Sequence, residues 1–79
     1  MLEERIILEN GFFLEVFLFP RMEYRLSCSR INQPLVEYKS NGRKHSRSVS
    51  GRESAYEFKS VEKLRYDFER DAEDALRQD

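Results

Sequence analysis

Cysteine and histidine each occur only once, and this scarcity excludes several kinds of site. With Cys28 alone, no intrachain disulfide can form, so the sequence gives no indication of an oxidising compartment. Cys28 and His45 are too few for a zinc site, which needs about four closely spaced ligands, and we expect no metal. The three glycines are isolated, so there is no glycine-rich phosphate loop, and we expect no cofactor.

Long apolar runs and an excess of charge of one sign are also lacking. The longest apolar stretch, residues 12–19, is interrupted by Glu15 and is far shorter than the roughly 20 residues of a membrane-spanning helix. Glu3 and Glu4 make the N-terminus acidic, unlike that of a signal peptide, so we expect a cytoplasmic protein with no membrane contact. The net charge of −1 provides no overall attraction to nucleic acid.

What the sequence does contain suits one small folded domain, residues 1–79. Hydrophobic residues make up 39% of the chain, which is enough for a core, and charged residues make up 37%, which indicates a heavily solvated surface. A chain of this size buries only about 60% of the surface that its unfolded form exposes. We therefore expect limited stability, and a gain from self-association or from a partner.

Two apolar stretches near the N-terminus flank Asn10-Gly11. An Asn-Gly pair between apolar runs is a strong signal for a two-residue β-hairpin loop, because a type I′ turn needs positive φ at both positions. Such a loop pairs Leu8 with Phe13. The second strand, 12–19, is apolar on both faces, so its second face needs cover from another layer, from a partner or from a second copy in a homodimer.

Residues 22–31 alternate between apolar and polar side chains, as in an antiparallel strand with one wet face. The side that points inward is expected to hold Met22, Tyr24, Leu26 and Cys28. A free cysteine on the apolar side of a strand behaves as a small hydrophobic residue. We therefore interpret Cys28 as part of the core rather than as a nucleophile.

A second Asn-Gly pair, Asn41-Gly42, predicts a second hairpin, in which Tyr38 faces His45. The return arm of this hairpin, 43–49, is polar on both faces. Such a composition suits a weakly held edge strand, where basic side chains also deter unwanted pairing. One face of the arm is expected to hold His45, Arg47 and Val49.

The C-terminal residues 60–77 predict an amphipathic helix, with Ser60 at the N-cap position. Apolar residues recur at steps of three and four along one stripe: Val61, Leu64, Phe68, Ala72, Ala75 and Leu76. The predicted fold is therefore α+β, an antiparallel β-meander of four to five strands with one C-terminal α-helix packed on the sheet. The strands are expected at residues 4–9, 12–19, 22–31, 35–40 and 43–49.

Charge is segregated along the chain, with a basic middle and an acidic C-terminal part. The basic segment holds Arg43, Lys44, Arg47 and Arg52. We interpret these four as candidate partner-binding residues, which contact either the phosphates of a nucleic acid or an acidic protein surface. A solvated edge strand with no binding role is the alternative that the charge pattern leaves open.

The predicted helix offers a second candidate surface beside its apolar stripe. Helical spacing places Tyr66, Glu69 and Glu73 on one flank, with the tyrosine exposed. An exposed tyrosine of this kind is typical of a binding hot spot. The alternative is an ordinary solvated helix that is held by pairs such as Glu73 with Arg77.

His45 lies among basic side chains, an arrangement that a small ribonuclease could use. His45 would act as the base, and Arg43, Lys44 or Arg47 would bind the scissile phosphate. The sequence places no second acid or base beside His45, so an enzyme is not the preferred interpretation.

Residues 56–64 lead from a strand into the helix and read YEFKSVEKL. This joint, after an antiparallel meander, resembles the layout of small phage-encoded inhibitors of bacterial defence, including some anti-CRISPR proteins. The resemblance implies a non-enzymatic protein that binds a large nucleoprotein target, and it assigns no role to a particular residue. The leading hypothesis is therefore a small inhibitor or adaptor of a larger protein or nucleoprotein. A nucleic-acid-binding module that uses residues 43–52 is the second hypothesis, and a ribonuclease with His45 is the third.

Overall fold

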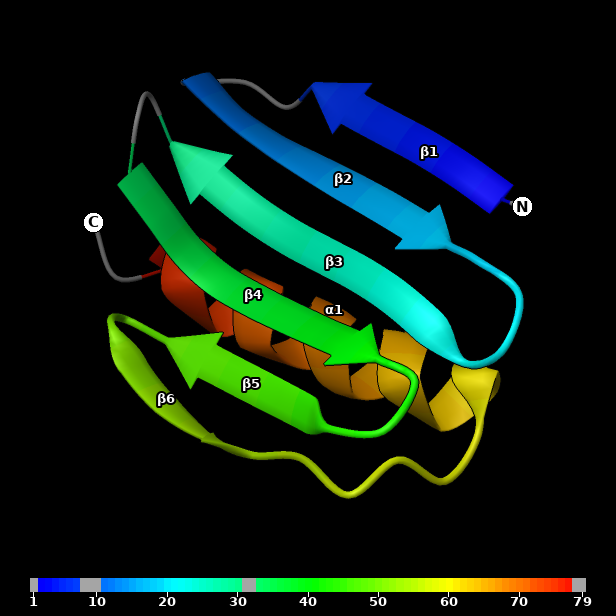
Figure 1. Ribbon diagram of the computed structural model, residues 1–79. Coiled ribbons are helices and arrows are strands. Elements are labelled where there is room, and N and C mark those ends of the chain that lie inside the picture. Colours follow the sequence, from blue (N-terminus) through cyan, green and yellow to red (C-terminus); the bar gives the residue numbers. More distant parts are fainter. Residues whose placement is uncertain (1, 8–10, 31–32, 78–79) are drawn as a thin grey trace.

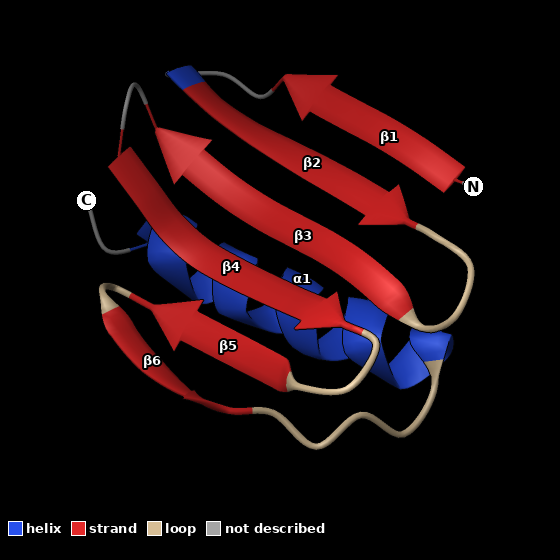
Figure 2. Ribbon diagram, viewed as in Figure 1, coloured by secondary structure: helices blue, strands red, loops and turns tan. Residues whose placement is uncertain are grey.

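The computed structural model describes residues 2–7, 11–30 and 33–77. In this part of the chain, six antiparallel strands are followed by one helix (Figure 1, Figure 2). The elements are β1 (Leu2–Ile7), β2 (Phe12–Leu18), β3 (Glu23–Arg30), β4 (Gln33–Asn41), β5 (His45–Val49), β6 (Arg52–Ala55) and α1 (Val61–Arg77). Each strand pairs with the next along the chain. The predicted α+β meander is confirmed, with one strand more than expected.

The strand that the sequence did not indicate is β6, which pairs with β5 and forms one edge of the sheet. Ser50 and Gly51, with φ of 50° and 82°, make the tight turn between the two strands. β5 is thus an inner strand rather than the predicted edge. All four residues of β6 are exposed. β6 is held by its backbone pairing with β5 and buries no side chain. Its sequence therefore shows no alternation of apolar and polar residues from which a strand could be predicted.

In the first hairpin, the register differs by one residue from the prediction. Ile7, rather than Leu8, is the partner of Phe13, and residues 8–10 of the loop lie outside the described residues. The observed register sets Arg5 opposite Glu15, with 3.1 Å between Arg5 Nη2 and Glu15 Oε2. A slip of one residue would move every side chain of β1 to the other face. The observed register therefore places Arg5 and Ile7 on the same face as Glu15 and Phe13.

In the second hairpin, the register differs by two residues from the prediction, because His45 pairs with Ser40 rather than with Tyr38. The turn is longer since the Asn41 side chain closes it, with Oδ1 accepting the backbone N–H of Lys44 at 2.9 Å. A shift of two residues leaves each side chain on its predicted face. The face of β5 toward α1 accordingly holds His45, Arg47 and Val49.

The helix α1 covers one face of the sheet and closes the hydrophobic core (Figure 1). Its buried residues are Leu64, Phe68 and Ala72. They pack on the inward side chains of β2, β3 and β4, namely Val16, Tyr24, Leu26, Cys28, Val36 and Tyr38. The prediction that Cys28 belongs to the core is confirmed, and burial raises the pKa of its thiol.

The start of α1 agrees with the sequence in its cap but not in its first apolar residue. Ser60 Oγ accepts the backbone N–H of Lys63 at 3.1 Å, so the predicted N-cap is confirmed. Val61 is exposed, against the prediction that it joins the apolar stripe. The first turn of α1 lies at the rim of the sheet (Figure 1). Among the described residues, no helix is long and apolar enough to cross a membrane.

Two tyrosines on the covered face are hydrogen-bonded to carboxylates of α1. Tyr38 OH donates to Asp71, and Tyr56 OH donates to Asp67 at 2.7 Å. Burial, followed by these hydrogen bonds, raises the pKa of both tyrosines. Desolvation of Asp67 acts in the opposite direction, but hydrogen bonds from Lys63 and Tyr56 hold the pKa of this carboxyl below its usual value. These contacts fix the position of the helix across the sheet.

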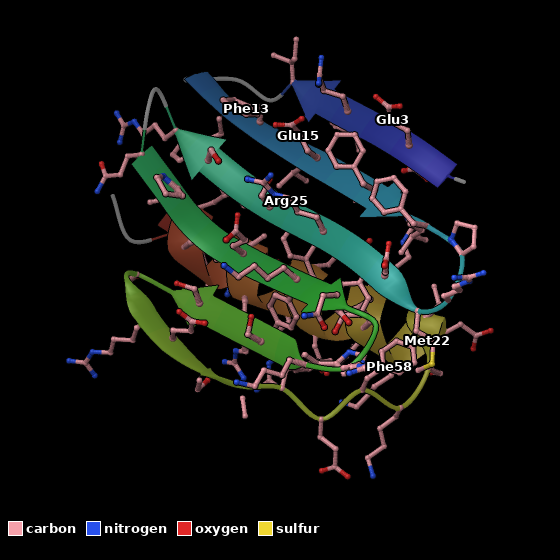
Figure 3. The ribbon with its side chains drawn as sticks, in the orientation of Figure 1. Glu3, Phe13, Glu15, Met22, Arg25 and Phe58 are labelled. Carbon is pink, nitrogen blue, oxygen red and sulfur yellow. The ribbon has the colours of Figure 1, made fainter. Side chains whose placement is uncertain are left out.

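The opposite face of the sheet is covered by no other element of the described chain, and we call it the open face. Figure 3 shows Phe13, Glu15 and Arg25 projecting from it. Several of its charged side chains pair within the sheet. Arg25 Nη2, for example, lies 3.3 Å from Glu37 Oε2 on the next strand.

Candidate functional site

Two turns with basic residues meet at one end of the sheet. In the antiparallel meander, the β2–β3 turn and the β4–β5 turn fall at the same end (Figure 1). Their backbones lie close together, since a Cβ atom added to Gly42 would be 3.1 Å from the carbonyl oxygen of Arg21. Gly42 also has φ of 93°, so its position requires glycine on both counts. We call Arg21, Met22, Arg43 and Lys44 the cationic turn pair.

The β2–β3 turn holds two non-glycine residues in the left-handed region. Arg21 and Met22 have φ of 63° and 64°, a conformation that costs on the order of 1–3 kcal/mol for each residue. Met22 is 51% exposed, so the prediction that it points inward is wrong. The reason is that β3 begins only at Glu23, and the alternation of the strand does not extend into the turn. Backbone strain of this kind clusters at functional sites.

The β4–β5 turn is fixed by the side chain of Asn41. Its Oδ1 accepts the backbone N–H groups of Arg43 at 3.0 Å and of Lys44 at 2.9 Å. The side chains of Arg43 and Lys44 are exposed. Within the described residues, neither of them forms an ion pair, nor does Arg21. Three cations thus lie at one end of the sheet without an ion pair, and Glu23 is the acidic residue next to them, with its Cγ 3.7 Å from the same added Cβ atom.

Arg47 lies on the covered face rather than beside Arg43 and Lys44. Its Nε is 3.0 Å from Asp71 Oδ2, and its Nη2 donates to Asp71 Oδ1 at 3.4 Å. The guanidinium carbon also lies 5.8 Å from the centroid of the Tyr38 ring. Because these contacts join β5 to α1, we interpret Arg47 as a residue that stabilises the fold rather than as part of the binding surface.

Arg52 is exposed and lies at the other end of β5, after the β5–β6 turn. The five residues of β5, at about 3.3 Å each, separate it from Lys44. With Arg47 it lines a hollow of about 680 Å³, whose other lining residues are Val49, Ser50 and Ser54. The basic segment of the sequence is therefore divided between two places: the turn with Arg43 and Lys44, and the hollow that Arg47 and Arg52 share.

The predicted helix surface lies on the side of α1 that faces away from the sheet. Tyr66 is 59% exposed, as predicted, and Lys63 Nζ lies 5.6 Å from its ring centroid. Glu69 and Glu73 are exposed as well. The predicted pair of Glu73 with Arg77 is confirmed, with 2.8 Å between Arg77 Nη2 and Glu73 Oε1. This flank and the cationic turn pair are separate surfaces.

His45 is enclosed by aromatic side chains on the covered face. Its Nδ1 lies 2.9 Å from Tyr24 OH, and its ring stacks on Phe58 with 5.2 Å between centroids. Tyr24 is buried, which raises its pKa to about 12. These contacts make His45 a packing residue that joins β5 to the segment before α1. No cluster of three or more metal-ligating side chains occurs among residues 2–7, 11–30 and 33–77.

Arg21 and Met22 are the members of the cationic turn pair that the sequence analysis did not identify. Pro20 indicates a turn at this point of the sequence. An antiparallel meander brings alternate turns to the same end of the sheet. The predicted meander could therefore have placed the turn after Pro20 beside the turn at Asn41-Gly42. Their direct contact depends on Gly42, whose role is visible only in three dimensions.

Known proteins add no assignment to this geometry. Comparisons of the chain with protein-family models, with curated proteins and with solved structures found no match in any of the three. The cationic turn pair is therefore interpreted from its own residues and their surroundings.

Proposed function

We propose that the chain is a non-enzymatic binding protein that engages an acidic surface of a larger protein or nucleoprotein partner through the cationic turn pair. One observation carries this proposal. Arg21, Arg43 and Lys44 come from two separate turns, lie at one end of the sheet, and have no carboxylate partner among the described residues. Three cations beside a single acid, Glu23, leave a local excess of positive charge, which attracts an acidic surface and speeds association with it.

Met22 favours a protein as the partner over a nucleic acid. It is exposed beside the cations and is held there by a strained turn. Methionine and arginine are both enriched in protein interfaces, where apolar side chains form the centre and polar groups form the rim. Contacts to phosphate use charged and polar groups and gain little from an apolar side chain among them.

A small inhibitor is the form of this function that the resemblance to phage-encoded inhibitors implies. An inhibitor or adaptor of this kind needs a rigid surface that occupies a charged site of its target, and it needs no catalytic group. The close contact of the two turns and the hydrogen bonds of Asn41 favour such rigidity. A surface that is already ordered loses little conformational freedom on binding, which favours affinity.

The test compares two charge reversals in the tagged full-length chain. The double variant Arg43→Glu with Lys44→Glu reverses the charge of the β4–β5 turn. Arg52→Glu is the matched control, because Arg52 is exposed at the other end of β5 and forms no ion pair within the described residues. Proteins captured from a nuclease-treated cell extract are quantified by mass spectrometry for the wild type and for both variants.

We expect the double variant to capture a partner at least about tenfold less than the wild type, since like charges across an interface cost several kcal/mol. The control is expected to capture it as the wild type does. Equal loss or equal retention in the two variants contradicts the proposal. Circular dichroism of the double variant, which changes only exposed side chains, checks that the fold is unchanged.

A nucleic-acid-binding module is the second candidate, and the same three cations favour it. Fluorescence anisotropy with labelled DNA and RNA, titrated with salt, measures this activity. Affinity that falls steeply with salt and is absent from the double variant would assign the cationic turn pair to phosphates. No binding to either nucleic acid at low salt would reject this candidate and leave the protein partner as the remaining interpretation.

A further inference from the structure

The open face carries a strip of apolar side chains that no element of the described chain covers. The open-face strip consists of Ile7 on β1 and of Phe13, Phe17 and Phe19 on β2 and directly after it. Ile7 is 81% exposed, and Phe19 is exposed as well. The rings of Phe17 and Phe19 stack, with 6.4 Å between centroids and 8° between planes. An exposed apolar strip of this kind typically marks an interaction surface.

An ion pair lies between the two ends of the strip. Arg5 on β1 and Glu15 on β2 are opposite each other in the register, with 3.1 Å between Arg5 Nη2 and Glu15 Oε2. A hollow of about 360 Å³ adjoins this pair, and it is lined by Arg5, Ile7, Gly11, Phe12, Phe13 and Glu15. β1 thus presents a base and an exposed apolar side chain, while β2 presents an acid and an aromatic ring.

We infer that a second copy of this chain covers the open-face strip, and that the two open faces pack about a two-fold axis parallel to the strands, between β1 and β2. Rotation about this axis lays β1 of each copy over β2 of the other. Arg5 then lies over Glu15 of the second copy, and Ile7 lies over Phe13 of the second copy, beside the hollow. Both copies make the same contacts, as a closed two-fold dimer requires.

The charges distinguish this axis from the other two-fold axis that the face allows. An axis perpendicular to the strands, through the same ion pair, would set Glu15 over Glu15 of the second copy. Arg5 would meet Arg5 in the same way, and like charges in contact cost several kcal/mol. The axis parallel to the strands instead sets each base over an acid. This arrangement is complementary in charge at Arg5 and Glu15 and apolar at Ile7 and Phe13, while Phe17 lies over Glu3 of the second copy.

The charges also disfavour a nucleic acid as the occupant of the open face. Among the described residues, the register places five acids on this face: Glu3, Glu15, Glu23, Glu37 and Glu53. It places three bases there: Arg5, Arg25 and Lys39. Three bases against five acids leave a net charge of −2, which repels phosphate. The stacked rings of the strip alone do not offset this repulsion, because single-strand binding also needs a basic groove.

Analytical ultracentrifugation of the full chain at submillimolar concentration tests the dimer. We expect the wild type to sediment as a dimer. Arg5→Glu is expected to sediment as a monomer, because it sets acid against acid at each of the two symmetric contacts. The double variant Arg5→Glu with Glu15→Arg exchanges the charges and is expected to restore the dimer. A circular dichroism spectrum and a melting temperature for each variant show whether the fold is retained.

Two further variants locate the interface. Phe13→Lys is expected to weaken self-association at least tenfold. Ser48→Lys is the matched control, since Ser48 lies on the same face, on β5 and away from the strip, and we expect this variant to remain a dimer. The turn variant Arg43→Glu with Lys44→Glu is also expected to remain a dimer. The test of the dimer is therefore independent of the test of the proposed function.

Three results would overturn the inference. The first is a wild type that stays monomeric throughout the concentration range. The second is a charge exchange that fails to restore the dimer while the fold is retained. The third is a monomer that binds labelled single-stranded DNA and loses that binding in Phe17→Ala, which would assign the strip to a nucleic acid.

Discussion

The two faces of the sheet are built from alternate residues of the same strands, and they differ in where their polar groups find partners. On the covered face, Tyr38 OH donates to Asp71, which belongs to α1. On the open face, Arg25 pairs with Glu37 of the neighbouring strand, and no second layer takes part. The covered face therefore depends on the helix for its polar contacts, whereas the ion pairs of the open face form within the sheet.

The apolar side chains of the two faces differ in the same way. Leu26 on the covered face is fully buried against residues of the same chain. Phe17 on the open face keeps part of its ring exposed and stacks only on Phe19. The comparison indicates that the covered face supplies the stability of the monomer and that the open face is available for association.

Truncation of a phenylalanine on each face is expected to give the largest difference between them. Phe68→Ala removes a ring from the centre of the core and is expected to cost about 3–5 kcal/mol of unfolding free energy. Phe17→Ala removes the same atoms from the open face and is expected to cost roughly a third of that amount, because the lost area is already partly in water. Urea unfolding at low protein concentration, followed by circular dichroism, measures both values.

An equal loss in the two phenylalanine variants would contradict the comparison, because it would show that the open face is packed as tightly as the core. Phe19→Ala is a useful control, since its ring lies beyond the end of β2 and is exposed. It is expected to change the free energy of unfolding less than Phe17→Ala does. Phe68→Ala leaves the open-face residues unaltered, so any folded fraction of this variant should still self-associate.

The covered face also predicts a loss of stability in alkali. Burial raises the pKa of Tyr24 to about 12, and it also raises the pKa of Tyr38 and of Tyr56. Tyrosine in the unfolded chain ionises near pH 10, at about its ordinary value. Below that pH both states are protonated and the stabilisation is complete. As the pH rises from about 10 to about 12, the unfolded state loses the proton first, so the stability falls.

Tyr24 alone is expected to contribute on the order of 2 kcal/mol to this loss. Urea unfolding at successive pH values measures it, and ionised tyrosine is followed by absorbance at the same time. Tyr24→Phe removes the ionisable group, so its stability should fall less steeply with pH than that of the wild type, even if the starting value is lower. A variant that loses stability as steeply as the wild type would show that Tyr24 is not the source.

The fold class could be predicted because it depends on patterns that are local in the sequence. The alternation of 22–31 and the apolar stripe of 60–77 each identify their element, and Ser60 marks where the helix begins. The registers could not be predicted from Asn-Gly turns. The Asn41 side chain closes a longer loop in the second hairpin, and in the first hairpin the strands pair one residue away from the register that a two-residue loop gives.

The candidate site could be predicted only in part, because neighbours in the sequence are separated by strand geometry. Arg43 and Lys44 stay together on one turn. Arg47 points to the covered face, where it meets Asp71, a residue 24 positions away whose place depends on how the helix docks. Met22 was expected in the core. Pro20 indicates a turn before it, but the alternation that begins at Met22 hides the fact that the left-handed turn includes this residue.

The smallest expected effects come from two arginines, one on each face. Arg47→Ala leaves Asp71 without its basic partner beside the buried Tyr38. It is expected to lower the free energy of unfolding by about 1–2 kcal/mol, because the Arg47 side chain is 42% exposed and water partly screens its charge. Arg25→Ala breaks the pair with Glu37 where the arginine is 64% exposed, and it is expected to cost about 0–0.5 kcal/mol. Urea unfolding at low and at high salt measures both.

Salt sharpens this last comparison because it screens exposed charges more than partly buried ones. The small cost of Arg25→Ala should vanish at high salt, while most of the cost of Arg47→Ala should persist through its hydrogen bonds to Asp71 and its contact with the ring of Tyr38. Equal costs for the two variants at both salt concentrations would mean that docking against α1 adds nothing to an ion pair. In that case the contrast between the faces would hold for apolar side chains alone.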